Sequence, residues 1–265
     1  MRPTDQMQKI ARASCDPLWI QHRFLATGHD VTLDNGTATF IKFRNRYFIC
    51  TCRHVADAAK GDFVPALMAG QLILNVASCH PDGVYRHNFR FPDRDNYDIA
   101  IAPMTDFHFG LMESRKGKAA IDLDAWEDPE WPTAGTLAAV GYLNEHKHNQ
   151  ADNVATPMNF AVADLASSIG PQLPTFTLSS IVDEAHGLFF SGMSGGPVFI
   201  TASEDKMIPV GIIFEGGPSS GRHENPQSSI GATDIFIRAH TLTPTIFEGW
   251  LAAVGLLSSS VSAGC

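Results

Sequence analysis

The sequence has no apolar run of the roughly 18 residues that a membrane-spanning helix needs. Its N-terminal segment, 1–19, also lacks the apolar core of a signal peptide. We therefore expect no contact with a membrane, and the cytoplasm is the expected compartment.

An excess of positive charge is also missing. The chain has 19 Lys and Arg against 28 Asp and Glu, a formal net charge of −9, and no stretch in which basic and aromatic residues alternate. Nucleic-acid binding depends mainly on cations that face phosphates. The composition therefore argues against a nucleic-acid partner.

Cysteine is scarce, and the five residues do not suggest a framework of disulfides. Cys50 and Cys52 lie two apart in an apolar segment, so in a strand both would face the same side of the sheet. No second Cys or His pair lies at a spacing that would complete a metal site with them. Small core residues are the favoured interpretation, and we expect no metal and no cofactor.

What the chain does contain is a series of short apolar or alternating segments separated by turn residues. This pattern predicts an all-β sandwich or barrel rather than a helical protein. A hairpin is expected around Arg44 and Asn45. The expected strands are 37–43, 47–52, 71–78, 85–91, 98–104, 136–143, 158–165, 175–182, 197–200, 209–214 and 232–238.

One helical pattern stands out near the C-terminus, where apolar residues recur at helical spacing between 246 and 257. Two starts are consistent with it. Thr243 can cap the helix with Pro244 in its first turn, or Thr245 and Glu248 can form a capping box. We expect this helix to pack on the outside of a β core.

Two polar stretches suggest how the chain is organised. The charged, Pro-containing segment 114–135 separates two groups of strands and is the expected connection between them. The segment 215–229 is rich in Gly, Pro and Ser, which is typical of a surface loop. The predicted division is a lead-in segment 1–20, a first β-domain 21–120, a second β-domain 121–242, and a C-terminal helix and tail 243–265.

The stretch "FFSGMSGGPVFI", 189–200, places Ser194 among three glycines and before a proline. A tight turn between two strands explains this composition. A second explanation is a backbone bend that projects the hydroxyl and aims nearby N–H groups at one point. A serine nucleophile also needs a base to take its proton and a carboxylate to orient that base.

Two residues at expected strand ends meet these needs. His54 follows an apolar strand and opens a short helical stretch, and Asp98 begins another apolar strand. A carboxylate at the edge of a core needs a partner, which an imidazole N–H would supply. Each residue taken singly has an ordinary explanation as a strand-end histidine, a cap or a turn hydroxyl.

Taken together, "TCRH" with His54, "NYDIAI" with Asp98 and "GMSGGPVF" with Ser194 resemble the chymotrypsin/trypsin-like serine protease family. The order His, Asp, Ser and the separations of 44 and 96 residues are similar to that family as well. The resemblance covers roughly residues 35–240, and the GxSGGP element is its most specific part. "VGIIFEGG", 210–217, looks like the strand that borders the primary specificity pocket.

This resemblance implies two six-stranded antiparallel β-barrels with an active site between them, His54 and Asp98 in the first and Ser194 in the second. Ser194 would attack a peptide carbonyl and form an acyl-enzyme, His54 would act as general base and then acid, and Asp98 would hold the imidazole. The N–H groups of Gly192 and Ser194 would bind the oxyanion, at about 3–4 kcal/mol per donor in comparable sites. A protein or peptide is the implied substrate.

The chain departs from the family in ways that bear on activation and specificity. Met193 stands where many members carry an Asp that pairs with a freed N-terminus, so activation of that type is not expected. An acid is missing at Leu188, where an Arg/Lys preference would need one, which favours an apolar P1 residue. The residues expected to line the substrate pocket are Leu188, Phe189, Phe214, Glu215 and Gly216.

Of two rival interpretations, only the first stays open. Phe214, in place of a small serine beside the triad Asp, together with Met193, is compatible with a protease fold used as a binding or sensor protein, or one that a regulatory protein partner activates. "GMSGG" also matches the elbow of an α/β-hydrolase, with Asp234 and His240 as its partners. That fold needs a helix directly after the serine, and "GGPVFI" disfavours one.

Overall fold

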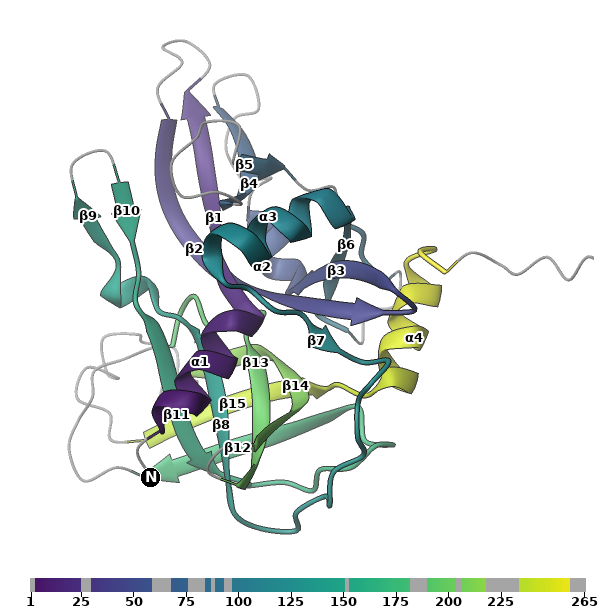
Figure 1. The fold of residues 1–265 in the computed structure, drawn as a ribbon. Coiled ribbons are helices and arrows are strands. Elements are labelled where there is room, and N and C mark those ends of the chain that lie inside the picture. The colour runs from purple at the N-terminus through teal and green to yellow at the C-terminus, as the bar shows by residue number, and fades with distance from the viewer. Residues whose placement is uncertain are drawn as a thin grey trace, which may run out of the picture.

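Two antiparallel sheets, one above the other in Figure 1, contain most of the strands. The computed structural model describes residues 3–24, 30–58, 68–75, 84–86, 89–92, 97–150, 153–181, 190–203, 206–217 and 234–257.

The first sheet is built from the N-terminal half of the chain. Its strands are β1 (Cys15–Phe24), β2 (Asp30–Phe43), β3 (Arg46–Thr51), β4 (Met68–Asn75), β5 (Val84–Arg86), β6 (Ala100–Met104) and β7 (Ile121–Asp122). Six of them pair antiparallel in the order β5-β4-β1-β2-β3-β6, and β7 adds a short parallel pairing to β2. Arg90, shortly after β5, forms a bridge with Ile101 of β6, so the sheet curls back on itself.

The second sheet is built from the C-terminal half. Its strands are β8 (Thr136–Tyr142), β11 (Met158–Asp164), β12 (Thr175–Ile181), β13 (Pro197–Ser203), β14 (Lys206–Gly217) and β15 (Asp234–Thr241). They pair in the order β11-β8-β13-β14-β15-β12. A bridge between Leu165 and Leu178 joins the two outer strands and closes the curl. A separate hairpin, β9 (His148–Gln150) and β10 (Asn153–Ala155), extends between β8 and β11.

The two sheets are topological copies of each other. The six antiparallel strands of each sheet can be numbered in chain order. When the pairings are followed around the curled sheet, both sheets give the same cyclic order: first, second, third, sixth, fifth, fourth. The all-β prediction of two six-stranded antiparallel sheets is thereby confirmed. The residue limits proposed for the two β-domains remain a prediction.

The expected hairpin between β2 and β3 is present, with Arg44 and Asn45 as its two-residue turn. Their φ values of 51° and 54° lie in the left-handed region. Two-residue hairpins favour such turns because the backbone twist then matches that of the strands, and Asn tolerates the conformation well.

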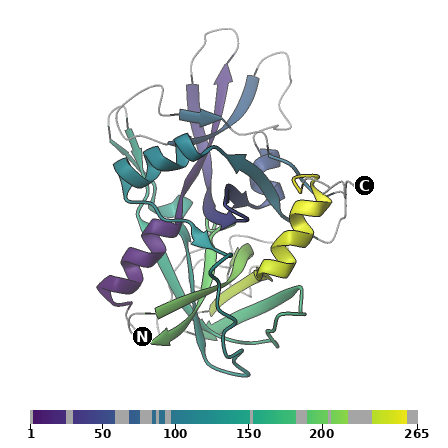
Figure 2. The same cartoon turned by 45° about the vertical axis from the view of Figure 1, so that its right-hand side comes forward.

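The expected C-terminal helix is α4 (Pro244–Ala253), and its first predicted start is confirmed. The Thr243 side chain accepts a hydrogen bond from the backbone N–H of Ile246, with Pro244 in the first turn. Phe247 and Trp250 are buried in a cluster with residues of the first sheet and with Ile212 of β14. In Figure 2, α4 (yellow) accordingly lies beside both sheets.

Three further helices surround the sheets. The short α2 (Arg53–Ala58) follows β3, as expected from the stretch after His54. Sequence reasoning did not find α1 (Asp5–Ser14) or α3 (Asp106–Lys116), each of which begins after a threonine cap. None of the helices in the described ranges is long and apolar enough to cross a membrane.

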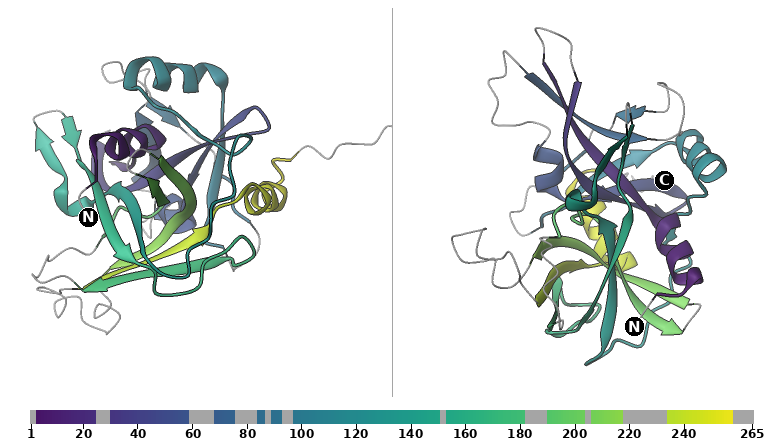
Figure 3. Two further views of the ribbon diagram at one scale, coloured as in Figure 1. Left: turned by 60° about the horizontal axis from the view of Figure 1, so that its bottom comes forward. Right: turned by 90° about the vertical axis from the view of Figure 1, so that its left-hand side faces the viewer.

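The helix α1 and strand β1 occupy most of the predicted lead-in segment. Met7 and Ala11 of α1 are buried against Val140 and Phe199 of the second sheet. The chain then passes directly into β1, which belongs to the first sheet, as the right-hand view of Figure 3 shows. The N-terminal segment therefore contributes to both halves of the molecule.

The prediction that Cys50 and Cys52 face the same side is wrong. Cys50 lies in the core cluster with Phe48, whereas Cys52 lies in the cluster that contains Ile49. The reason is that β3 ends at Thr51 and the chain turns into α2, so strand alternation no longer applies at Cys52. Both cysteines are fully buried.

We expect Phe247→Ala to lower the free energy of unfolding by about 3–5 kcal/mol, because the ring is fully buried between α4 and the first sheet. The matched control Thr245→Ala alters an exposed position on the same helix and should change it by less than about 0.5 kcal/mol. Urea unfolding followed by tryptophan fluorescence measures both. Equal effects of the two changes would show that α4 is not part of the cooperative core.

Candidate active site

A cleft of about 350 Å³ lies where the two sheets meet. The first half supplies residues from β1, β2 and α2, and the second half supplies the segment before β13 and the end of β14. The lining residues are Ile20, Asp34, Asn35, His54, Val55, Ala58, Asn144, Phe190, Ser191, Gly192, Ser194, Phe214, Glu215 and Gly216. His54 and Ser194 thus face one cavity, although 140 positions separate them in the sequence.

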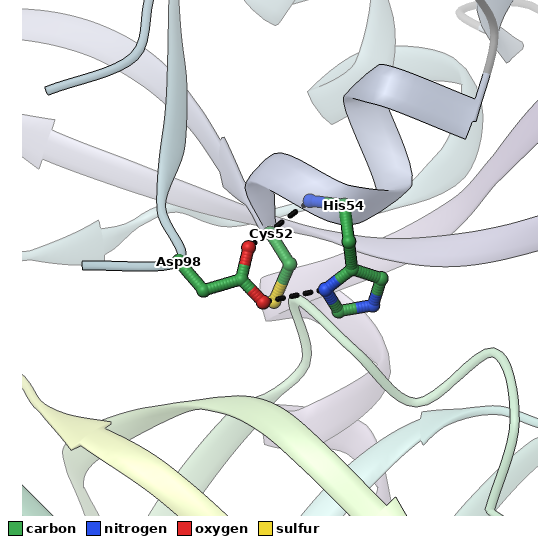
Figure 4. A group of neighbouring side chains, drawn as sticks. All are labelled: Cys52, His54 and Asp98. Atoms are coloured by element: carbon green, nitrogen blue, oxygen red, sulfur yellow. Dashed lines mark hydrogen bonds and ion pairs between the residues drawn. The ribbon is translucent and has the colours of Figure 1, made fainter. Parts of the chain in front are cut away.

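His54 and Asp98 form a two-point contact (Figure 4). Oδ2 of Asp98 lies 2.5 Å from Nδ1 of the imidazole, and Oδ1 accepts a hydrogen bond of 3.0 Å from the backbone N–H of His54. Burial raises the pKa of Asp98, but the hydrogen bonds and charge of His54 outweigh burial and leave that pKa below its ordinary value. An ionised carboxylate on Nδ1 keeps Nε2 available to accept a proton.

No hydrogen bond joins Ser194 to His54 within the described residues. Nε2 lies on the far side of the ring from Asp98 (Figure 4), and Ser194 lines the same cleft. In unliganded enzymes, catalytic hydrogen bonds are often long and shorten when substrate binds. The arrangement therefore has the components of a nucleophile, a base and an orienting carboxylate.

The loop around Ser194 follows a backbone path that only glycine can take at two positions. Gly192 and Gly195 have φ values of 91° and 92°, in the region that L-residues rarely adopt. A Cβ at Gly192 would lie 2.3 Å from the carbonyl oxygen of Tyr142, and one at Gly195 would lie 2.0 Å from that of Thr37. The glycines are therefore required by both conformation and space.

Strand β2 of the first sheet holds this loop through the loop's carbonyl groups. The backbone N–H of Thr37 donates to the carbonyl of Ser194 at 2.9 Å, and its hydroxyl donates to that of Gly192 at 2.8 Å. The hydroxyl of Thr39 donates to the carbonyl of Gly195 at 2.7 Å. Successive carbonyls are thus fixed toward β2, across the junction between the sheets.

Two N–H groups of the same loop have no acceptor among the described residues. The N–H groups of Met193, Gly195 and Gly196 are bonded to carbonyls inside the protein, whereas those of Gly192 and Ser194 are not. These two are the donors that the family resemblance assigns to the oxyanion hole. Backbone donors in a pre-formed loop can stabilise a developing negative charge without reorganisation.

Met193 anchors the loop from the other side. Its side chain is fully buried in the core cluster of the second sheet, with Val198 and Ile213. A Cβ at Gly141 of β8 would lie 2.8 Å from the Cα of Met193, which shows how closely the loop packs on that strand. Apolar burial therefore fixes this position, at which many members of the family that the sequence resembles carry an ion-paired Asp.

The structure describes three of the five predicted pocket residues. Phe214, Glu215 and Gly216 line the cleft, and their role in a substrate pocket stays a prediction. Leu188 and Phe189 lie outside the described residues. Phe190, which the prediction did not include, is buried against Gly216 and lines the cleft.

Phe214 and Glu215 are held by side chains of β15. The Phe214 ring stacks on the His240 ring at 4.3 Å, and the guanidinium of Arg238 lies 5.0 Å from the centre of the Phe214 ring. Arg238 also forms a 2.9 Å ion pair with Glu215. This wall of the cleft is thus supported from behind by His240 and Arg238.

Sequence reasoning missed a polar cluster that also lines the cleft. The backbone N–H of Asn35 donates to Oδ1 of Asn144 at 2.9 Å, and its side-chain amide donates to the carbonyl of Tyr142 at 2.8 Å. Asn144 in turn donates to the hydroxyl of Ser191 at 3.0 Å. Both asparagines stand in turn-like sequence contexts, so no local signal distinguishes them from ordinary turn residues.

The α/β-hydrolase interpretation is excluded by the strand that follows the serine. Pro197 begins β13, not a helix. His240, the base that this rival required, is buried and does not line the cleft.

Cys52, His54 and Asp98 offer three ligand atoms within 4.8 Å of one another, as in a metal site. The sulfur of Cys52, however, donates to the carbonyl of Ile213 at 2.9 Å, and burial raises the pKa of this thiol well above its ordinary value. Metals bind thiolates rather than thiols. The donor set therefore fits a hydrogen-bonded His–Asp pair better than a metal centre.

Comparison with known proteins finds no match in sequence and distant similarities in structure. No known family model and no curated protein matches the chain in sequence. A mutant, inactive form of Rv3671c from M. tuberculosis H37Rv is similar in structure, with 14% identity, a TM-score of 0.45 and coverage of 100% of this chain and 98% of that one. A mutant of the Tobacco Etch Virus protease gives 12% identity, a TM-score of 0.41 and coverage of 90% and 78%.

The strand order of the two sheets decides the architecture. Two six-stranded antiparallel sheets of identical cyclic order meet at one cleft, and a C-terminal helix follows. The fold is a trypsin-like double β-barrel.

The hydroxyl of Thr37 has two hydrogen-bond partners, because it donates to Gly192 and accepts from the N–H of Tyr142, whereas that of Thr39 bonds to Gly195 alone among the described residues. Each buried group left unpaired costs about 1–3 kcal/mol. We therefore expect Thr37→Val to lower the free energy of unfolding by more than Thr39→Val. Urea unfolding of the two isosteric variants measures the difference, and equal losses would contradict the two-partner role.

Burial lowers the pKa of His240 from 6.5 to about 4, with Asp98 and Arg238 as the charged groups near it. Between pH 6.5 and 4 the unfolded chain binds this proton and the folded chain does not, so stability falls as the pH falls, by roughly 3 kcal/mol in all. His240→Gln should lack this component. The pKa of Asp98 is also lowered, and its contribution to the free energy of unfolding is lost only below this pH range.

Urea unfolding at pH 7 and pH 4.5 tests this expectation. Wild type should lose more stability between the two values than His240→Gln does. Parallel losses would show that His240 titrates normally in the folded protein.

Proposed function

We propose that the protein is a serine endopeptidase that hydrolyses peptide bonds through Ser194, His54 and Asp98. Ser194 attacks the carbonyl carbon while His54 takes its proton at Nε2. The acyl-enzyme forms when His54 gives that proton to the leaving amine. A water molecule then attacks the acyl-enzyme while His54 takes its proton, and His54 returns the proton to Ser194 as the acyl group leaves. Asp98 holds the ring and stabilises its charged form.

One observation carries the proposal: His54, which is bonded to Asp98, lines a single cleft together with Ser194 and Gly192, whose backbone N–H groups have no acceptor among the described residues. The 2.5 Å contact between Nδ1 and the carboxylate gives the base its orientation. The free N–H groups of Gly192 and Ser194 lie in the loop that presents the hydroxyl. Nucleophile, base and charge stabilisation are the components that acyl transfer requires.

The cleft supports an apolar P1 preference. Phe190 and Phe214 contribute apolar walls, and the carboxylate of Glu215 is already paired with Arg238. An unpaired acid at the base of the pocket is what an Arg/Lys preference would need, and Leu188 is not an acid. We propose cleavage after apolar residues in a protein or peptide substrate.

A second candidate follows from the missing contact between Ser194 and His54. A protease fold in which a regulatory protein partner must bring these side chains together would show this arrangement at rest. The same geometry would serve a catalytically weak binding or sensor protein. In both cases the purified chain would react slowly with reagents directed at serine.

A fluorophosphonate probe separates these candidates. We expect it to label wild type and to label neither Ser194→Ala nor His54→Ala, because the probe needs an activated hydroxyl. Ser203→Ala, which alters an exposed serine at the end of β13, is the matched control and should label normally.

Peptide profiling with protein that the probe labels then tests the P1 specificity. Cleavage after apolar residues is the expected result, and cleavage after Arg or Lys would refute the pocket assignment. An unreactive wild type that becomes reactive only with another protein present would favour the partner-activated candidate.

A further inference from the structure

His240 lies beside the carboxylate residue of the site without lining the cleft. It comes from β15, and its ring is only 2% exposed. Nε2 accepts a hydrogen bond of 3.2 Å from the backbone N–H of Asp98. The contact joins the second barrel to the segment that precedes β6 of the first.

Aromatic rings enclose the His240 side chain. The ring of Phe214 stacks on it at 4.3 Å, and those of Tyr97 and Trp250 lie at 5.8 and 6.1 Å. Such packing leaves the imidazole little freedom to rotate. The acceptor nitrogen is thereby held at one place relative to Asp98.

We propose that His240 is a positioning residue, which fixes the main chain of Asp98 and the ring of Phe214 so that Asp98 can orient His54. This rests on the proposed function, because it assigns His240 a part in the same site.

The phenylalanine at position 214 explains why Asp98 needs a separate positioning residue. In the family that the sequence resembles, a small serine stands beside the triad carboxylate, whereas Phe214 has no hydroxyl to offer. Among the described residues, both hydrogen bonds to the carboxylate of Asp98 come from His54. A carboxylate tied only to the group that it must orient needs a separate anchor, and the bond from its own N–H to His240 supplies one.

The role requires a neutral imidazole with its proton on Nδ1, because Nε2 must accept from Asp98. Arg238 on the same strand, Asp98 on the neighbouring segment and the rings of Tyr97, Phe214 and Trp250 are the groups that face it. A glutamine can replace the acceptor with its side-chain oxygen. A phenylalanine keeps the stacking and removes the acceptor.

These two substitutions provide the test. We expect His240→Phe to lower kcat and the rate of fluorophosphonate labelling by about 10- to 100-fold, since a small misplacement of a catalytic group has effects of that size. KM should stay within about twofold, and His240→Gln should recover most of the rate. Thr241→Val is the matched control, because it alters the adjacent buried residue of β15 and should leave the labelling rate unchanged.

A spectroscopic measurement keeps the inference independent of activity. The NMR signal of the His54 Nδ1 proton should move upfield in His240→Phe relative to wild type, because a displaced carboxylate forms a weaker hydrogen bond with that nitrogen. His240→Gln should leave that signal close to its wild-type position.

Two results would overturn the inference. One is an unchanged signal of the His54 Nδ1 proton in His240→Phe. The other is equal labelling by wild type and both variants while urea unfolding shows only a loss of stability, which is the signature of core packing alone. A wild type that the probe never labels would instead refute the proposed function, and the NMR measurement would still decide the role of His240.

Discussion

The donation of hydrogen bonds from β2 to the serine loop is the interaction on which the rest of the site depends. Thr37 and Thr39 belong to the first barrel, and the carbonyls that they bind belong to the second. These carbonyls share their peptide groups with the N–H groups of Met193, Gly195 and Gly196, which bond to carbonyls of the second barrel, so each of these peptide groups is held from both sides. The free N–H groups of Gly192 and Ser194 belong to the neighbouring peptide groups, and their orientation therefore depends on contacts with both barrels.

The sequence was informative where a residue's environment is local. The Arg44-Asn45 turn, the Thr243 cap and most strands were predictable from neighbouring residues, and so was the grouping of His54 and Ser194 through a family pattern. The helix α1 was missed because its apolar residues are few and widely spaced among polar ones, although Thr4 provides a cap. Local patterns also failed at Cys52, where a strand ends one residue earlier than alternation implied.

The supporting residues of the site could not be predicted, because their roles exist only across long sequence distances. Asn35 and Asn144 meet over 109 positions, and Asp98 and His240 over 142. A buried histidine in an alternating strand looks the same in sequence whether it fills a core or accepts a specific hydrogen bond. Tertiary contact, and not residue type, distinguishes the two.

The terminal helices have a consequence for how the molecule holds together. The N-terminal helix α1 packs on the second barrel, while the C-terminal helix α4 buries its aromatic residues against the first. Each barrel thus packs against the terminal helix that lies nearer in sequence to the other barrel. Separating the two halves would expose the buried faces of both helices at once, so this exchange of helices stabilises the junction at which the cleft lies.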